Sequence, residues 1–302
     1  MKVAILGSPR GWHVQALRRA LECRGIAVAC LPITRLVACI APPRSPKLGG
    51  EMPWVRSRQE PLDDYDALFV RAIPGGSLEQ IVFRVDALHR LENAGVCIVN
   101  PPTTIERTVD KYYTSSLLED TGLPTPRTVV TERFDEALVA FRELGGDVVV
   151  KPLFGSEGRG MVRVSDPDTA YRVFRALELG RYVYYLQEFI PHSNEDIRAF
   201  VIGDQVVAAM VRRADSWKTN VAQGAEAEPL TLSVELEEMS LRAARALGAD
   251  YAGVDILCSE GGDVYVMEVN GIPGWAKLRQ VTGVDVAGRL VEYVVGQIRS
   301  RE

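Results

Sequence analysis

Short apolar runs alternate with an amphipathic helical pattern over the first third of the chain. Residues 2–7 and 26–33 are apolar enough for strands, and the stretch HVQALRRALECRG between them repeats its apolar positions at helical spacing. The same order of strand, helix and strand returns in residues 66–100. This alternation predicts a small open α/β sheet in a first domain, residues 1–104. Residues 41–61 are rich in Pro, Gly and Arg and are predicted to form a loop.

Two further domains are predicted, at residues 105–185 and 186–302. The first of them begins with a helix that Asp110 caps, and it contains a strand, a glycine-rich turn and a second strand in DVVVKPLFGSEGRGMVRVS. The last third contains two apolar hairpins, which turn at Gly203-Asp204 and at Gly261-Gly262. The combined pattern is typical of an α/β domain followed by α+β units.

Polar side chains interrupt the last strand of the second hairpin. Glu268 and Asn270 stand two positions apart in VYVMEVNGIPG, so they share one face of that strand. The turn brings Asp255 of the preceding strand roughly opposite Glu268. Carboxylate and amide oxygens are the hard ligands that Mg²⁺ or Mn²⁺ take. We therefore predict a metal site at Asp255, Glu268 and Asn270. The alternative is a strand face that is simply solvated.

Two other stretches carry candidate binding groups. Lys151 ends an apolar strand, and the glycines that follow it leave backbone N–H groups free to cradle phosphate oxygens. The alternative is an ordinary hairpin with an extended lysine. The strand end YLQEFI can offer backbone hydrogen bonds to an adenine edge, with Asp196 shortly after it for ribose hydroxyls; the alternative is a plain edge strand. GSPRGW, after the first strand, lacks the GxGxxG spacing and predicts a tight turn.

Composition narrows the class of protein. The net charge is -5 and the sequence pI is near 5.5, which does not favour a nucleic-acid-binding protein. No apolar run approaches the roughly 20 residues of a membrane helix, so we expect no membrane partner. The start MKVAILGSPR has no signal-peptide pattern, which indicates a cytoplasmic protein.

The order of these stretches resembles the ATP-grasp superfamily, and within it the RimK-type carboxylate–amine (glutamate) ligases. The resemblance covers about residues 100–290, and the first domain is similar only to a generic pre-ATP-grasp domain. The stretches that carry it are DKYYTSSLLEDTGLPTPRT, VVVKPLFGSEGRGM, QEFIPHSNEDIRAFVIGDQVVAAMVRRA, WKTN, AGVDIL and VMEVNGIPG.

The resemblance implies a role for each matching residue. Lys111 and Lys151 contact ATP phosphates. Gln187, Glu188, Phe189 and Ile190 hold adenine, and Asp196 binds near the ribose. Lys218, Thr219 and Asn220 lie beside the triphosphate, and Asp255, Glu268 and Asn270 hold Mg²⁺ or Mn²⁺. Arg198 and Arg213 are the candidates for the substrate carboxylate or its acyl phosphate. The two arginines lie at similar distances from the turn at Gly203-Asp204, so we expect them to approach one another with an anion between them.

We therefore expect an ATP-dependent ligase that forms an amide through an acyl phosphate. Its partners are ATP, an amino acid, for which glutamate is favoured, and a carboxylate acceptor. The start LGSPRGWHV favours a one-carbon cofactor of the tetrahydromethanopterin type as acceptor, while a protein tail or carrier protein remains an alternative. SWKTNVAQGAEAEPL departs from close relatives and leaves the acceptor open, and a homo-oligomer is also left open. The second class of function is a non-catalytic ATP-binding regulator.

Overall fold

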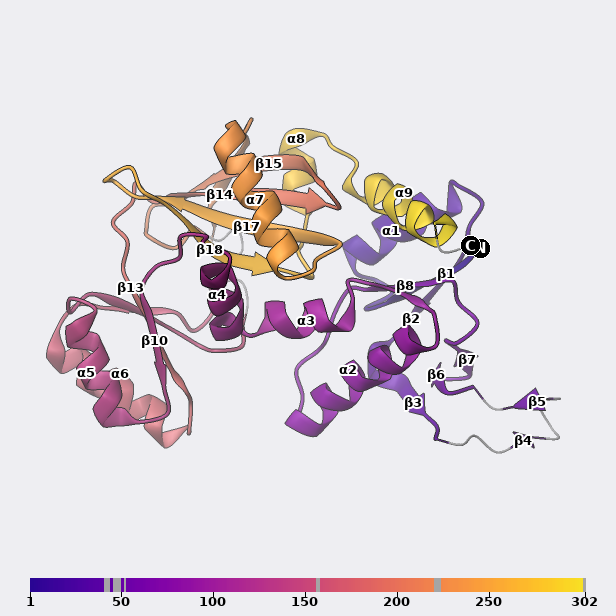
Figure 1. Cartoon of the computed structure of the whole chain (residues 1–302), viewed down its shortest axis with the longest axis horizontal. Helices are drawn as coiled ribbons and strands as arrows, with labels where there is room; N and C mark the ends of the chain where they lie inside the picture. Colours follow the sequence, from indigo (N-terminus) through magenta and orange to yellow (C-terminus); the bar gives the residue numbers. More distant parts are fainter. Residues whose placement is uncertain (41–43, 46–49, 52, 156–157, 220–223, 301–302) are drawn as a thin grey trace.

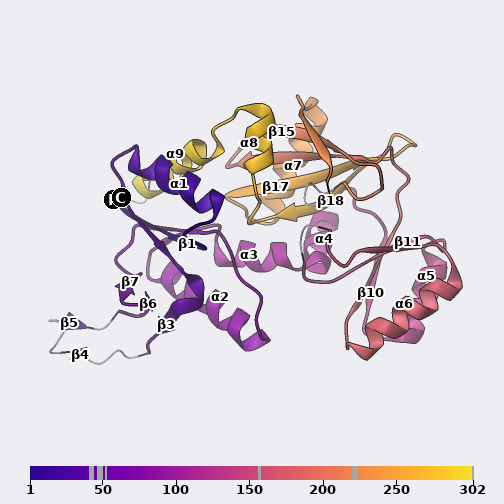
Figure 2. The ribbon, with the colours of Figure 1, turned by 180° about the vertical axis from the view of Figure 1, so that it is seen from behind.

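The computed structural model describes residues 1–40, 44–45, 50–51, 53–155, 158–219 and 224–300. It forms three units, with the N-terminal unit at one end, a lobe built around β10 and β13 at the other, and the strands β14 to β18 between and above them (Figure 1). The view from behind shows the same order and places both chain termini beside α9 (Figure 2). No helix in the described ranges is long and apolar enough to cross a membrane.

The N-terminal unit contains the predicted α/β sheet. Its strands are parallel in the order β2-β1-β8-β9, and helices pack on both faces, with α1 on one and α2 on the other. The elements are β1 (Lys2–Leu6), α1 (Trp12–Glu22), β2 (Ala27–Leu31), β8 (Ala67–Val70), α2 (Leu78–Asn93) and β9 (Cys97–Val99). The strands are buried on both sides because helices cover both faces, which explains why they read as continuous apolar runs.

The prediction of a loop over residues 41–61 is wrong for part of that range. Short strands β6 (Val55–Ser57) and β7 (Glu60–Pro61) pair with each other, and β6 also pairs with β3 (Leu36–Ala38). Strands this short carry no readable alternation, so their pairing depends on contacts between distant segments. The remaining short elements here are a turn of 3-10 helix (Ile33–Arg35), β4 (Arg44–Ser45) and β5 (Gly50–Glu51).

The middle unit is an antiparallel sheet with two helices on one face. The strand order is β10-β13-β11-β12, and α5 and α6 enclose an apolar core against it. The elements are β10 (Thr128–Thr131), α5 (Phe134–Glu143), β11 (Val148–Lys151), β12 (Val162–Val164), α6 (Pro167–Leu179) and β13 (Tyr184–Glu188). The expected boundary at 185/186 falls within β13, whose pairing partners β10 and β11 belong to this unit.

Two helices lead from the first unit into the second. They are α3 (Pro102–Val109), within which the expected boundary at 104/105 falls, and α4 (Lys111–Asp120). Asp110 caps α4 as predicted, because its Oδ1 accepts hydrogen bonds from the backbone N–H groups of Tyr112 and Tyr113 at 2.9 and 3.1 Å. This cap fixes the place where Lys111 enters the site.

The C-terminal unit is built on a five-stranded antiparallel sheet in the order β16-β15-β14-β17-β18. One face packs against α4 and α7, and part of the other packs against α8, α9 and α1. The elements are β14 (Glu195–Ile202), β15 (Gln205–Arg213), β16 (Glu226–Pro229), α7 (Val234–Ala246), β17 (Tyr251–Cys258), β18 (Val264–Asn270), α8 (Ala276–Thr282) and α9 (Val286–Arg299). Both predicted hairpins are present.

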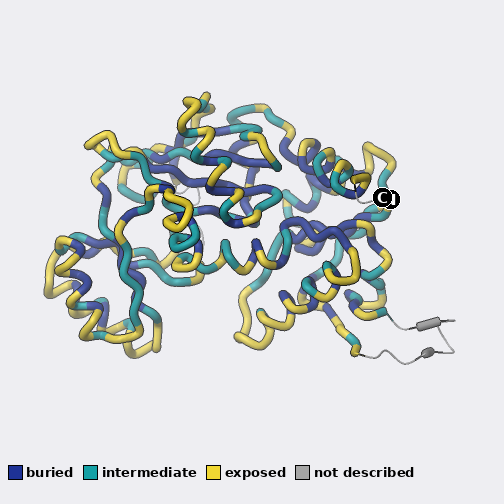
Figure 3. Tube along the Cα trace, viewed as in Figure 1, coloured by how far each residue is buried: buried dark blue, intermediate teal, exposed yellow. Residues whose placement is uncertain are grey.

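Burial follows these layers. The strands of the first and last units are mainly buried, whereas the outer sides of α2, α5 and α6 are exposed (Figure 3). The C-terminal helix α9 packs in one apolar cluster with α1 and with residues of β14 and β15, so it joins the first unit to the last. Asn100, which is fully buried, adds a polar connection: its Nδ2 donates to the carbonyl of Tyr251 at 2.7 Å, and its Oδ1 accepts from the backbone N–H of Tyr251 at 3.0 Å.

Candidate active site

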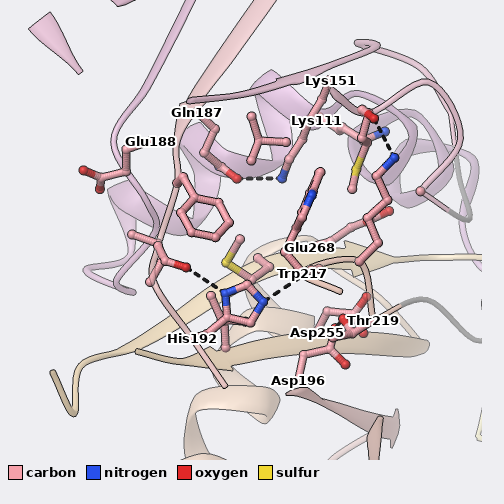
Figure 4. Close-up of a pocket in the computed structure, with 18 of the residues that line it drawn as sticks. Lys111, Lys151, Gln187, Glu188, His192, Asp196, Trp217, Thr219, Asp255 and Glu268 are labelled. Carbon is pink, nitrogen blue, oxygen red and sulfur yellow. Dashed lines mark hydrogen bonds between the residues drawn. The ribbon is translucent and has the colours of Figure 1, made fainter. Parts of the chain in front are cut away.

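One pocket lies between the middle sheet and the C-terminal sheet. Lys151 and Gln187 line it from β11 and β13, and Asp255 and Glu268 line it from β17 and β18 (Figure 4). The sequence-predicted residues that line it are Lys111, Lys151, Gln187, Glu188, Phe189, Ile190, Asp196, Lys218, Thr219, Asp255 and Glu268. Asn220 is outside the described residues, and Arg198, Arg213 and Asn270 are not among those lining the pocket.

Two lysines stand on the side of the pocket formed by the middle unit. Lys151 Nζ donates a hydrogen bond to Gln187 Oε1 at 2.6 Å, and Lys111 Nζ donates to the carbonyl oxygen of Gly155 at 2.6 Å. Burial lowers the pKa of Lys151 to about 8; Lys111 also lowers it, whereas Glu268 and Asp255 oppose the shift. Near pH 7 this ammonium is therefore still mainly protonated, but it is far easier to deprotonate than an exposed lysine.

A charged row crosses the C-terminal sheet on the opposite side. Arg198 of β14 is the register partner of Asp255, and Asp255 is the register partner of Glu268. A β-bulge or similar irregularity follows Asp255, and it leaves Met267 of β18 without a register partner on β17. With this extra residue in β18, Asp255 lies opposite Glu268 while Ile256 lies opposite Val266. The predicted position of Asp255 opposite Glu268 is confirmed by this register. Asn270 lies two residues beyond Glu268 and accepts a hydrogen bond from the Ile272 backbone N–H at 2.9 Å.

Two arginines hold Asp255. Arg198 donates to both of its oxygens, with Nη2 at 2.7 Å from Oδ2, and Arg212 Nη2 lies 3.0 Å from Oδ1. Burial alone would raise the pKa of Asp255, but Arg198 and Arg212 outweigh it and the pKa is lowered. Glu268 is different, because none of the described side chains forms an ion pair or hydrogen bond with it. It is therefore the carboxylate left available to a cation.

A second ion pair extends this network. Arg212 binds Asp196 through Nε at 2.6 Å and Nη2 at 2.5 Å, and the Thr219 hydroxyl donates to Asp196 Oδ2 at 2.6 Å. Burial raises the pKa of Asp196 although Arg212 opposes that shift. Both oxygens of Asp196 are thus already bonded within the protein. Its position beside the pocket agrees with the expectation, but its immediate partners are Arg212 and Thr219.

The expected contact between Arg198 and Arg213 is wrong. Arg213 is exposed, and it pairs with Glu195 at 2.9 Å and with Glu228 on the outer side of the sheet. The reason is that Arg198 lies five residues before Gly203 whereas Arg213 lies nine residues after Asp204, so Arg198 pairs with Met210 and Arg213 with Glu195. The β14–β15 hairpin also has a register shift between Phe200 and Val201. A shift of one residue exchanges the two faces of a strand, so Arg212, rather than Arg213, lies on the face that carries Asp196 and Arg198.

The far end of the pocket is aromatic. Phe189, His192 and Trp217 pack together, with ring centroids 5.7 Å apart for Phe189–His192 and 6.3 Å for Phe189–Trp217. His192 Nδ1 lies 2.7 Å from the Ile190 carbonyl oxygen, which ties the loop to the end of β13. Glu188 is held by the backbone N–H of Arg127 at 2.7 Å and by its Nε at 2.6 Å. The flat aromatic surfaces at the end of β13 suit a planar heterocycle.

Sequence reasoning missed three of these residues. His192 and Trp217 line the pocket, and Arg212 reaches Asp255 beneath it. The two aromatic residues stand in loops beside motifs that were recognised, in EFIPHS and SWKTN, and that proximity was the available signal. Arg212 carried no such signal, because its face depends on the register shift.

The comparisons with known proteins agree with this geometry. Residues 108–294 match the RimK-like ATP-grasp domain. The chain is 35% identical over 297 residues to the tetrahydromethanopterin:alpha-L-glutamate ligase of Methanococcus maripaludis, which covers 97% of each chain. It is 41% identical over 246 residues to the ligase of the same name from Methanocaldococcus jannaschii, covering 79% of this chain and 82% of that one. The solved ATP-grasp ligase PsnB, complexed with a minimal precursor, Mg and ADP, superposes with a TM-score of 0.74 over 98% of each chain at 22% identity.

This chain belongs to the RimK-like ATP-grasp domain family. It is an ATP-dependent ligase, and its fold is the ATP-grasp fold with an N-terminal α/β domain. The class expected from the order of motifs in the sequence is therefore confirmed.

Proposed function

We propose that this ligase joins the amine of L-glutamate to a carboxylate of a tetrahydromethanopterin-type acceptor. The observation that carries the proposal is the pocket in which Lys111 and Lys151 face the row of Asp255 and Glu268. Two relatives that match along most of their length are named for this reaction, which supports the choice of amino acid and acceptor.

The chemistry requires activation of the acceptor. A carboxylate is a poor electrophile, and transfer of the γ-phosphoryl group of ATP converts one of its oxygens into part of a good leaving group. The glutamate amine then attacks the acyl carbon, the C–O bond to phosphate breaks, and amide, phosphate and ADP result. The protein's main tasks are to position the reactants and to stabilise the negative charge on the phosphoryl oxygens.

Each side of the pocket has its own part in this proposal. The ammonium groups of Lys111 and Lys151, with the glycine-rich turn after Lys151, bind the phosphates. Gln187 to Ile190 bind the adenine edge, and Phe189, His192 and Trp217 pack around the base. Lys218, whose Nζ donates to the Met161 carbonyl at 2.8 Å, joins the phosphate side. Arg198, which does not itself line the pocket, holds Asp255 in place from β14.

The residues present fit a divalent cation. Glu268 offers a carboxylate in the pocket wall that no described side chain pairs with, Asp255 lies directly opposite, and Asn270 has an amide oxygen on the same face. These are the oxygen donors that Mg²⁺ or Mn²⁺ takes together with phosphates. Bound there, such a cation supplies neutralisation of charge on the phosphoryl oxygens. Asp255 reaches it only through lone pairs that the arginines leave free.

The test is a reaction with purified protein, Mg²⁺, ATP, L-glutamate and tetrahydromethanopterin. The proposal predicts ADP release that depends on both substrates and a product heavier by one or more glutamyl residues. If ADP is released only with a protein-tail or carrier-protein substrate, the protein is still a ligase but the proposed acceptor is wrong. Absence of turnover with every carboxylate, in a protein that still binds ATP, would indicate a regulator.

A further inference from the structure

Three loops meet at one end of the N-terminal sheet, outside the pocket described above. Residues 7–11 follow β1, residues 71–76 follow β8, and residues 271–275 follow β18. In the strand order β2-β1-β8-β9, the chain continues from β1 to β2 at one edge of the sheet and from β8 to β9 at the other edge. Ligands of parallel α/β sheets bind at such a topological switch point, outside the carboxyl ends of the strands. The GSPRGW stretch lies here.

Arg71 joins these loops. Its Nη1 donates to the Tyr251 hydroxyl at 2.8 Å and its Nη2 to the Pro273 carbonyl at 2.7 Å. Its guanidinium carbon lies 4.4 Å from the ring centroid of Trp275. Within the described chain, two buried donors at this contact have no acceptor: Arg71 Nε and Trp275 Nε1. Trp275 is only 1% exposed, so an unsatisfied N–H there is costly in the free protein.

Aromatic side chains surround these donors. His13 packs edge-on against Trp275 with centroids 4.6 Å apart, and its Nε2 accepts a hydrogen bond from the Trp275 backbone N–H at 2.9 Å. Burial, and secondarily Arg71, lower the pKa of His13 to about 4, so the ring is neutral and serves as acceptor and packing surface. Trp12, 41% exposed, lies against both rings. We call Trp12, His13, Arg71 and Trp275 the switch-point cluster.

The cluster adjoins the charged row through the C-terminal sheet. Tyr251 lies four residues before Asp255 on the same face of β17, which is about 13 Å along the strand. Between them Gly253 has no side chain, and a Cβ there would lie 2.5 Å from Arg198 Nη1 and 3.0 Å from Pro273 Cβ. Arg198 and the 271–275 loop therefore meet over Gly253.

We propose that the switch-point cluster binds the heteroaromatic ring of the acceptor, while the acceptor's carboxylate reaches the row of Arg198 and Asp255. This assignment rests on the proposed function. Ring nitrogen and carbonyl atoms satisfy the two orphan donors, and the rings of Trp12 and His13 pack on the planar system. Glutamate does not fit this cluster, because it has no ring to pack on the aromatic side chains. Its ammonium group would also be repelled by Arg71, which no acidic side chain contacts among the described residues.

The test compares Arg71→Gln and Trp275→Phe with wild type in steady-state ligation. Arg71→Gln removes a charged donor, so the acceptor KM rises about tenfold to a hundredfold. Trp275→Phe keeps an aromatic ring and removes one N–H, so the acceptor KM rises about threefold to tenfold. The KM values for ATP and glutamate stay within about twofold. Arg90→Gln is the matched control, because it removes a similar arginine–indole contact, with Trp54 at 4.2 Å, elsewhere in the same unit.

A binding measurement keeps the result independent of turnover. We would use 6-methylpterin, which has the ring but no acceptor carboxylate, and detect it by saturation-transfer NMR. If 6-methylpterin binds to the wild type and this binding is lost in Arg71→Gln or Trp275→Phe, the result supports the ring site. It does so even if tetrahydromethanopterin is not ligated, and in that case only the proposed function is contradicted. If the wild type is active and both variants keep the wild-type acceptor KM and the wild-type pterin binding, the proposed ring site is wrong and the proposed function stands. If Arg71→Gln does not fold, Trp275→Phe decides.

Discussion

Glu268 lies directly across the β17–β18 pair from Asp255, but of the two carboxylates only Asp255 is held by arginine side chains in the described structure. The two acids therefore differ in what they contribute. Asp255 is part of a closed ion-pair network, whereas Glu268 is open to the pocket. Substitutions at the two positions separate catalytic loss from structural loss.

Glu268→Gln should abolish most of the ligation while the protein stays folded. The change removes the free charge that would hold the cation, and charge stabilisation of this kind is worth several kcal/mol, so kcat should fall by at least about a hundredfold. ADP release under saturating Mg²⁺ measures the effect, and thermal unfolding checks the fold. Glu260→Gln, an exposed acid near the turn of the same hairpin, is the control. Wild-type turnover of Glu268→Gln would remove the metal assignment.

Asp255→Asn should also destabilise the protein, by about 3 kcal/mol, because it leaves Arg198 and part of Arg212 without their buried counter-charge. The pKa of Asp255 is lowered from its ordinary value of 3.8, so this stabilisation is present above that pH and is lost as the pH falls through the lowered pKa. Urea unfolding at pH 7 and at pH 3 checks both statements. Equal stabilities of wild type and variant at pH 7 would contradict the ion-pair account.

Nucleotide affinity should fall as the pH rises through about 8. Lys151 has its pKa lowered to about 8, and the bound phosphates favour its protonated form, so binding above that pH must take up a proton. Calorimetric titration of ATP between pH 7 and 9.5 measures the slope. Lys151→Arg keeps its charge over this range and should show a flat profile. A wild-type profile as flat as that of Lys151→Arg would place Lys151 away from the phosphates.

Arg213→Lys should leave kcat and the acceptor KM within about twofold of wild type. Arg213 forms pairs with Glu195 and Glu228 that are exposed to solvent, and such pairs contribute little because water and salt screen them. Arg212→Lys should instead cost about 2 kcal/mol of stability, since lysine cannot bridge Asp196 and Asp255 with a planar fork. Kinetics and urea unfolding of the pair of variants check this. The opposite ranking would mean that the register of β14 and β15 is misassigned.

The sequence alone was enough for the elements that carry local signals. Alternation of apolar residues predicted the hairpins, and the shared face of Glu268 and Asn270 led to Asp255 across the turn. Asp110 was identified as a helix cap from its position before a helical pattern. The order of motifs predicted the family, which the match over residues 108–294 confirms.

What the sequence did not yield depends on register and on distant contacts. The register shift between Phe200 and Val201 places Arg212, rather than Arg213, on the face of the sheet that carries Asp196 and Arg198, and no residue pattern in that hairpin predicts the shift. β6 is held by pairing with β3, and β7 by pairing with β6, rather than by a pattern in their own residues. The contact between Arg71 and Trp275 joins residues 204 positions apart, so the GSPRGW stretch had no visible partner until the chain was folded.

The most direct test of the central claim is the fate of a heavy-oxygen label placed in the acceptor carboxylate. If ATP phosphorylates that carboxylate, the bridging oxygen of the acyl phosphate comes from the acceptor and leaves with phosphate when the glutamate amine attacks. Mass spectrometry should then find one labelled oxygen in the released phosphate for each amide formed. Unlabelled phosphate alongside labelled amide product would contradict the acyl-phosphate mechanism and the reading of the pocket that depends on it.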